Sequence, residues 1–206
     1  MFLPFFPLKL VAFPGEDLNL HIFEPRYRQL IAEVEEKNST FGVCTFIDSL
    51  TGFGTEVKLV QVLKRYEDGR LDIKTRGIRA FKINSFQNPV PDKLYSGGDV
   101  EFLDHDPKVS YSTHKEYLHY LKETLNYLGN PILGLENSIT SFSFAHKVGL
   151  KLEEELELLK LRSEEERSLF LIRHFRYMLP ILKAAESAKE KIKQNGHVKH
   201  LDPLNF

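Results

Sequence analysis

The sequence predicts an α+β protein in which a small β-barrel with one inserted helix is followed by a C-terminal helical bundle. Up to residue 106 the chain is rich in short runs of β-branched and aromatic residues, several of which alternate between apolar and polar positions. Beyond residue 106 the apolar residues recur every three or four positions, as they do along one face of a helix. Several short strands around one helix favour a barrel, because closure leaves no open sheet edge.

The first elements are expected within residues 13–33. Pro14 and Gly15 suit a tight turn, because proline pre-sets φ and glycine accepts a positive φ. Alternation of apolar and polar residues over 17–22 indicates a strand with one face on a core. Pro25 fits the first turn of a helix, where its missing N–H would have no partner in any case.

The rest of the N-terminal half is expected to consist of strands joined by turns. Strands are indicated over residues 41–48, 56–68, 69–86 and 99–104. Asp68 and Gly69 mark a hairpin turn, and Gly77 is expected to lie at a bulge. Residues 87–98 are expected to form a loop.

The C-terminal half is expected to hold four helices. The first is closed by Gly129, and the fourth opens with a capping box formed by Ser163 and Glu166. Pro180 is expected to kink or end that fourth helix. The apolar residues that define the four helical stripes are Leu118, Leu121, Leu125 and Leu128, then Ile139, Phe142, Ala145 and Val148, then Leu152, Leu156 and Leu159, then Leu169, Ile172, Phe175 and Leu179.

These elements divide the chain into a barrel domain over 1–106, a helical bundle over 107–196 and a tail over 197–206. The boundary is expected near residues 105–112, where the period of the apolar residues changes. Residues 183–196 are strongly helix-forming and mostly polar, so this end of the bundle is expected to project or fray.

Composition limits the classes of function. The 206 residues carry a formal net charge of −1, which gives no overall attraction to nucleic acid or to an anionic membrane. The single cysteine, Cys44, excludes an internal disulfide and is expected to be a buried small side chain in a reducing compartment. The apolar N-terminus lacks a basic region and is broken by Pro4 and Pro7, so a signal peptide is not expected. With no apolar run near the ~20 residues of a membrane span, the expected location is the cytoplasm.

The opening "LPFFPLKLVAFPGEDLNLHIFEPRYRQLIAE" resembles the start of the Lon N-terminal domain, the substrate-binding region of ATP-dependent Lon proteases. It is most similar to bacterial stand-alone proteins built around that domain. Further motifs follow in the same order, namely "FGV" at 41–43, "GT" at 54–55, "DGRLDI" at 68–73 and "GIRAFKI" at 77–83. The resemblance covers residues 1–104 well and extends more loosely through 143–175. The family often has proline where this chain has Asn19, which is a mild departure.

The resemblance implies a PUA-like barrel followed by a helical bundle. It also implies unfolded or damaged polypeptide segments as partners and allows a separate ATP-dependent protease as a second partner. The ATPase and Ser-Lys protease domains of full-length Lon have no counterpart in the sequence, and no G-x-x-x-x-G-K-[ST] loop is present to hold a nucleotide. The sequence does not indicate an oligomeric state.

The sequence contains no constellation that predicts catalysis, a cofactor or a metal. It has no G-x-S-x-G, H-E-x-x-H or C-x-x-C motif. His114 and His119 are five residues apart, so they do not share a helical face as two zinc ligands would. The acidic runs at 153–155 and 164–166 are expected at helix N-termini, where they complement the helix dipole. We therefore expect a non-enzymatic protein, with a small hydrolase as a remote alternative.

The loop expected at 48–56 is the best sequence candidate for binding polypeptide. Phe53 lies between Gly52 and Gly54, so it either projects from a flexible turn or folds back on the barrel. Leu50, Thr51 and Gly52 are the other expected contacts. The residues of the family signature are expected to be mainly structural: Phe13, Pro14, Gly15, Phe23, Glu24, Pro25, Arg26 and Tyr27.

The alternative from another functional class is an RNA-binding PUA-like module, because one fold can host several functions. Its candidate residues are Arg70, Lys74, Arg76, Arg79 and Lys82. A solvated outer strand face explains this cluster better, since acidic residues balance the total charge. Binding that depends on phosphate contacts would fall steeply with salt, whereas binding through apolar contacts would not.

Overall fold

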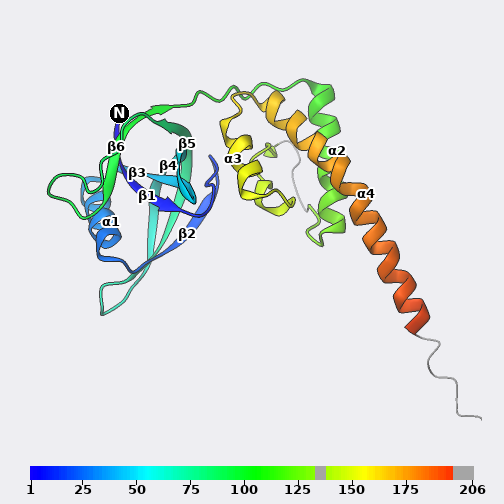
Figure 1. Ribbon diagram of the computed structural model, residues 1–206, viewed down its shortest axis with the longest axis horizontal. Helices are drawn as coiled ribbons and strands as arrows, with labels where there is room; N and C mark the ends of the chain where they lie inside the picture. Colours follow the sequence, from blue (N-terminus) through cyan, green and yellow to red (C-terminus); the bar gives the residue numbers. More distant parts are fainter. Residues whose placement is uncertain (133–137, 197–206) are drawn as a thin grey trace, which may run out of the picture.

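Six strands form one sheet that closes on itself (Figure 1). The computed structural model describes residues 1–132 and 138–196. The order of the strands is β2-β5-β4-β3-β1-β6, and β5 also pairs with β6, so five strands make a ring to which β2 is added. The strands are β1 (Phe2–Leu8), β2 (Asp17–Ile22), β3 (Thr40–Ile47), β4 (Ser49–Arg65), β5 (Leu71–Ile83) and β6 (Ser96–Phe102). The expected fold class is confirmed.

A bend in β5 lets this strand serve two neighbours. Residues 71–76 of β5 pair with β2, whereas residues 81–83 pair with β6. Between them, the register with β4 shifts at Gly77, where a bulge was expected. A Cβ at Gly77 would collide with the carbonyl oxygen of Phe13, so only glycine allows this close approach. The expected turn at Gly15, with φ of 83°, is held by an N–H bond of 3.0 Å to the Gly77 carbonyl.

Helix α1 (Pro25–Lys37) covers the barrel on the side away from the helical half (Figure 1). Pro25 occupies the first turn, as expected. Four of its side chains are buried and belong to a cluster with Phe41 and Ile73 of the barrel. These four are Tyr27, Leu30, Ile31 and Val34. The spacing of the four residues is that of one helical face, so burial of this face fixes α1 against the strands.

The helical half contains α2 (Tyr111–Tyr127), the short 3-10 helix η2 (Ala145–Lys147), α3 (Leu152–Lys160) and α4 (Glu164–Gly196). Figure 1 shows α4 beside α2 and then running on alone, so the later part of residues 183–196 projects as a helix, beyond the ion pair of Lys183 with Glu123 of α2. Gly129 has a positive φ of 74° just after α2, and Ser163 and Glu166 exchange capping bonds at the start of α4. Both helix signals are therefore confirmed. The tail over 197–206 lies outside the described residues.

One expected helix is absent from the described residues, and one of two alternatives for another helix is not observed. Residues 138–150 form turns and η2 instead of an α-helix. Serine and threonine in "TSFS" explain this, because local side chains take up the backbone groups: Thr140 N–H donates to Ser143 Oγ at 3.0 Å. Of the two alternatives for Pro180, an end of the helix is not observed, because α4 continues to Gly196, and a kink stays a prediction. Pro180 is exposed, so water can hydrate the Arg176 carbonyl that loses its helical partner.

One strand and one loop boundary also differ from expectation. Strand β1 was not anticipated, although it pairs with β3 in parallel and with β6 antiparallel. Its sequence contains Pro4 and Pro7, which weaken the strand pattern. The loop expected to last until residue 98 ends earlier, because Ser96, Gly97 and Gly98 pair with β1. These pairings complete the ring.

The barrel and the helices share one hydrophobic cluster. Val11, Phe13, Ala80 and Leu103 of the barrel half belong to it, together with the buried faces of α2, α3 and α4. The ring of Phe13 stacks on Phe142 with centroids 5.1 Å apart. The division of the chain near residue 106 stays a prediction. Among the described helices, none is long and apolar enough to cross a bilayer.

Candidate functional site

A cavity of about 310 Å3 opens on the barrel surface, and its lining is rich in aromatic and aliphatic side chains. We call this cavity the aromatic cup. It is formed by the end of β1, the start of α1, the β3–β4 hairpin and the segment before β6. Its lining residues are Pro7, Arg26, Tyr27, Phe46, Leu50, Phe86, Asn88 and Ser96.

The cup exposes large apolar surfaces that nothing in the described chain covers. Phe46 is 41% exposed and Phe86 is 49% exposed. Phe86 is held by stacking on Phe5, with the ring centroids 6.3 Å apart. Aromatic side chains that are fixed in place and exposed together mark a surface for apolar ligands.

The β3–β4 hairpin positions two of these residues. Asp48 has a positive φ of 54°, which aspartate tolerates better than most residues, and it reverses the chain tightly. Phe46 and Leu50 therefore become cross-strand partners. Since paired residues in a ladder share a face, both side chains reach the cup.

The polar part of the cup comes from the start of α1. Arg26 pairs with the carboxylate of Glu24 at 2.7 Å and lies over the ring of Tyr27, 4.5 Å from its centroid. Tyr27 itself stacks on Phe6 at 4.0 Å. Burial raises the pKa of the Tyr27 phenol, although the charge of Arg26 acts in the opposite direction. The phenol is therefore neutral over the physiological range, and Arg26, Asn88 and Ser96 supply hydrogen-bonding groups around an apolar floor.

The structure separates the four residues expected to contact polypeptide. Residues 49–56 lie in β4, so the expectation of a loop over 48–56 was wrong. The reason is that β3 pairs with this segment, and only the turn at Asp48 is left between the strands. Leu50 lines the cup, whereas the Thr51 hydroxyl donates to the Thr45 carbonyl at 2.9 Å.

Phe53 lies away from the cup. It pairs with Lys82 in β5, is half-buried and packs against the cluster shared with the helices. The Lys160 ammonium lies 5.0 Å from its ring centroid. Of the two alternatives for Phe53, folding back is therefore the one observed, and projection from a flexible turn was wrong. The assignment of a binding role to Phe53 and its neighbours stays a prediction.

Most residues of the family signature have clear structural roles. Phe13 is fully buried, and Pro14 and Gly15 form the turn that meets Gly77. Glu24 precedes α1 as its N-cap residue, although its side chain makes no capping bond. Phe23 is the exception because it is 59% exposed. Arg26 and Tyr27 also line the cup, which was not anticipated.

Sequence reasoning missed Phe46 and Phe86 as candidate site residues. A signal for Phe46 was available, because Phe46 and Leu50 flank Asp48 and Ser49, a pair of residues common in turns. No local pattern indicates Phe86, since its contact with Phe5 joins residues far apart in the sequence.

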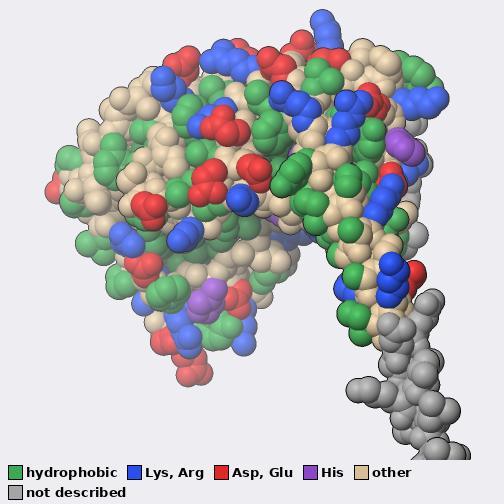
Figure 2. All heavy atoms as spheres, turned by 45° about the vertical axis from the view of Figure 1, so that its right-hand side comes forward, with side chains coloured by type: hydrophobic (Ala, Val, Ile, Leu, Met, Phe, Trp, Pro, Cys, Tyr) green, Lys and Arg blue, Asp and Glu red, His purple; other side chains and the backbone are tan. Residues whose placement is uncertain are grey.

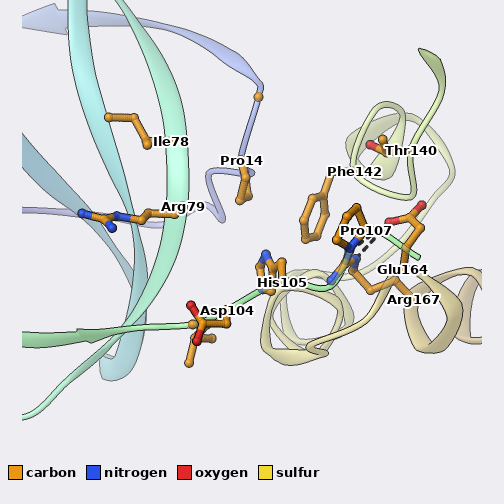
Figure 3. Close-up of a pocket in the computed structure, with 12 residues that line it drawn as sticks. Pro14, Ile78, Arg79, Asp104, His105, Pro107, Thr140, Phe142, Glu164 and Arg167 are labelled. Carbon is orange, nitrogen blue, oxygen red and sulfur yellow. Dashed lines mark hydrogen bonds and ion pairs between the residues drawn. The ribbon is translucent and has the colours of Figure 1, made fainter. Parts of the chain in front are cut away.

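A second cavity, of about 510 Å3, lies where the barrel meets the helical half (Figure 3). Figure 3 shows Pro14, Ile78 and Arg79 on the barrel side, with Pro14 toward Phe142 of the helical half and the Arg79 side chain directed away from it. The charged groups here already hold one another: Arg167 binds Glu164 at 2.9 Å, and Arg79 binds Glu56 at 2.7 Å. Both guanidinium groups also lie over aromatic rings, those of Phe142 and Phe102. Each of these contacts lies within one half, so the charges beside the cavity are satisfied without a ligand.

His146 links the two halves beside this cavity. Its Nδ1 lies 2.7 Å from Glu155 of α3, and its Nε2 lies 3.2 Å from Glu16 of the turn before β2. Both ring nitrogens face carboxylates, so both must carry a proton to donate. Burial opposes this charge, but the hydrogen bonds to Glu155 and Glu16 outweigh it and raise the pKa of His146 to about 10.

The basic residues considered for RNA are largely occupied by carboxylates of the barrel. Lys74 and Arg76 share Asp17 at 2.8 and 2.6 Å. Arg79 pairs with Glu56, and Arg70 pairs with Asp68 at 2.7 Å. This arrangement favours a solvated, charge-balanced strand face over a surface for phosphates.

Comparison with known proteins identifies the same kind of domain by two routes. A family model described as the ATP-dependent protease La (LON) substrate-binding domain matches residues 2–176. The crystal structure of a Lon N-terminal domain protein from Xanthomonas campestris is similar, with 25% identity and a TM-score of 0.66 over 84% of this chain and 98% of that one. The N-terminal domain of a Mycobacterium avium complex Lon protease shares the fold at 16% identity, with a TM-score of 0.66 over 85% and 98% of the two chains.

Proposed function

Because the chain belongs to the family of substrate-binding domains of ATP-dependent protease La (Lon), we propose that it recognises unfolded or damaged polypeptide segments without catalysing a reaction. The aromatic cup is the observation that carries this proposal. Unfolded segments differ from folded ones in presenting apolar side chains, and the cup offers Phe46 and Phe86 as exposed contacts for them.

The size of the cup suits weak and sequence-tolerant binding. Full burial of an exposed aromatic side chain contributes ~1.5–3 kcal/mol, so a client that covers the half-exposed Phe46 and Phe86 and the partly buried Leu50 gains roughly 2–4 kcal/mol. Loss of translational freedom and ordering of the client offset much of this gain. Binding of a single segment is therefore weak, which permits release of the client to another protein.

Delivery to a separate protease is the role in proteolysis that fits these features. The sequence has no phosphate-binding loop and no nucleophile with an adjacent base, so we assign neither ATP hydrolysis nor peptide cleavage to the chain. Burial raises the pKa of the Cys44 thiol, which suits a structural residue and not a nucleophile. We place the protein in the cytoplasm, where a single reduced cysteine is ordinary.

Substitution of the exposed aromatic residues tests the proposal. We expect Phe46→Ser and Phe86→Ser each to weaken binding of fluorescein-labelled, reduced and carboxymethylated lactalbumin by about tenfold, as loss of ~1.4 kcal/mol implies. Tyr177→Ser is the matched control, because Tyr177 is 74% exposed on α4, far from the cup. Fluorescence anisotropy measures binding, and circular dichroism checks the fold.

Two comparisons make the outcome specific. Equal affinity of the wild type and both cup variants would remove the cup from the site. Weakened binding by Phe53→Ser, with the cup variants unchanged, would move the site to the β3–β4 segment next to Lys160. Binding that falls steeply with salt and extends to RNA would instead support the alternative RNA-binding module.

A further inference from the structure

The outer edge of β2 is open. β2 stands at the end of the strand order and pairs with β5 alone. Across residues 1–132 and 138–196, no backbone group of Asp17–Ile22 is hydrogen-bonded to a backbone group outside β5. An open edge is a template for another strand, because its N–H and C=O groups repeat at the spacing of an extended chain.

The register shows which backbone groups face outward. Gly77 N–H donates to the Glu16 carbonyl at 2.9 Å, so the carbonyl of Glu16, just before β2, faces β5. In an antiparallel ladder the two types of pair alternate, so Leu18, Leu20 and Ile22 form the hydrogen-bonded pairs with β5. The N–H and C=O groups of Asp17, Asn19 and His21 therefore point away from β5.

The side chains of β2 leave this edge accessible. Leu18 and Leu20 are only half-buried on the core side, so a further strand would complete their cover. The charged side chains are already tied to β5: Asp17 binds Lys74 and Arg76, and His21 Nδ1 lies 2.6 Å from Asp72. The register runs without a bulge from Asp17 to Ile22, and β2 contains no proline. β2 thus lacks two devices that block edge pairing, a proline and a bulge.

A cavity of about 540 Å3 lies at the start of this edge. Glu16, Asp17 and Arg76 line it from the barrel, and Thr140, Phe142 and Ser143 line it from the helical half. Figure 2 shows the molecule hollowed between the barrel and the projecting part of α4. A strand added to β2 would therefore lie next to Thr140, Phe142 and Ser143 at the start of the edge.

We propose that an extended segment of unfolded polypeptide adds to β2 as a further strand. This site is distinct from the aromatic cup, and the inference rests on the proposed function because both name the same class of client. Main-chain bonds to Asp17, Asn19 and His21 would hold a segment of almost any sequence. Preference would come from alternate apolar residues of the client, which would lie over Leu18 and Leu20.

The test removes one outward N–H from the edge. Asn19→Pro deletes the donor but keeps the bonds to β5, because proline is compatible with an edge position whose N–H faces solvent. Asn19→Ala is the matched control, since it removes the side-chain amide and keeps the N–H. With a fluorescein-labelled peptide of alternating valine and threonine, we expect Asn19→Pro to weaken binding about tenfold and Asn19→Ala to leave it within about twofold.

Two further measurements keep the result clear if Asn19→Pro fails to fold. The same peptide with two adjacent backbone amides methylated should bind the wild type about tenfold more weakly, because neighbouring N–H groups serve opposite strand edges. Amide hydrogen exchange should slow at Asn19 and His21 when the unmethylated peptide is added. Leu20 should change little, because its N–H already bonds to β5.

The outcomes separate this inference from the proposed function. Peptide binding that is lost on Phe86→Ser, with no change in exchange at Asn19 and His21, would overturn the β2 site and leave the function standing. Absence of binding to any unfolded client would overturn both. A dimer that forms with concentration and disappears in Asn19→Pro, without peptide binding, would assign the edge to a second copy and overturn the inference.

Discussion

At the scale of single residues, the first turn of α4 both accepts hydrogen bonds from neighbouring side chains and holds a buried ion pair between Glu164 and Arg167. Glu165 and Glu166 receive hydrogen bonds from Ser110, Thr113 and Ser163, as expected for carboxylates near a helix start. Glu164, in contrast, is buried together with Arg167. Their ion pair of 2.9 Å and the bonds to Ser141 satisfy both charges inside the protein. The pair therefore ties α4 to the segment that replaces the expected second helix.

His146 provides a second tie, and its strength should depend on pH. Its folded pKa of about 10 lies above the ordinary value of 6.5, so folding favours the protonated ring. The resulting stabilisation is complete below pH ~6.5 and disappears as the pH rises through ~10. The side chain is 34% exposed, so solvent screening limits the expected contribution to about 1 kcal/mol.

We predict that His146→Gln lowers the Tm by about 2–4 °C at pH 6, as ~1 kcal/mol implies for a domain of this size. The difference from the wild type should shrink toward zero by pH ~10.5, where the imidazolium is lost. His119→Gln is the control, because His119 is exposed on α2, where its ring lies beside Tyr120. A Tm difference that stays constant from pH 6 to 10.5 would contradict the ionic bridge to Glu16 and Glu155.

At the scale of elements, the β3–β4 hairpin explains why the fold was easier to predict than the site. The alternation in β5 and the capping box of α4 are local patterns, and both were read correctly. Gly52 and Gly54 were read as loop residues, yet Gly54 lies in a paired strand. Glycine is required there because a Cβ would collide with the Val43 carbonyl and the ring of Phe81. The sequence alone does not distinguish a glycine that is required for close packing from one that is required for flexibility. The cup depends on such long-range contacts, so local patterns do not reveal it.

Substitution of Pro180 tests how much this proline destabilises α4. Proline inside a helix removes one hydrogen bond and its ring crowds the preceding turn, which together cost ~3 kcal/mol relative to alanine. Pro180 is exposed, so Pro180→Ala disturbs no core contact. We predict that Pro180→Ala raises the Tm and increases the circular dichroism signal at 222 nm.

Leu179→Ala is the contrasting variant, because Leu179 is only 3% exposed beside Pro180. Leu179→Ala should lower the Tm, because truncation of a buried leucine reduces the free energy of unfolding by about 2–5 kcal/mol. A lower Tm for Pro180→Ala would show that the proline supports the path of α4.

At the scale of the whole molecule, the chain joins its two halves by more than the covalent link. Leu103 and Phe13 of the barrel half are buried in the cluster formed with α2, α3 and α4. The backbone of Asp106 bonds to Arg162 and Glu164 at 2.7 and 2.8 Å, which pins the link to the start of α4. An interface that is apolar and hydrogen-bonded in this way holds its parts in one orientation. The aromatic cup and the β2 edge both belong to the barrel half, so the shared sheet fixes them relative to each other.

This leads to a prediction about a cleaved chain. Lys108 is exposed in the link, and limited proteolysis is expected to cut within residues 105–112 before it cuts within 56–86. A protease recognition site inserted after Lys108 allows cleavage there by design. The two fragments should still elute together from a size-exclusion column, because the shared cluster stays buried. Phe13→Ala should separate them after cleavage, since Phe13 is 0% exposed and loss of such a ring costs ~3–5 kcal/mol. Separate elution of the cleaved wild-type fragments without denaturant would show that the link, and not the cluster, holds the halves together.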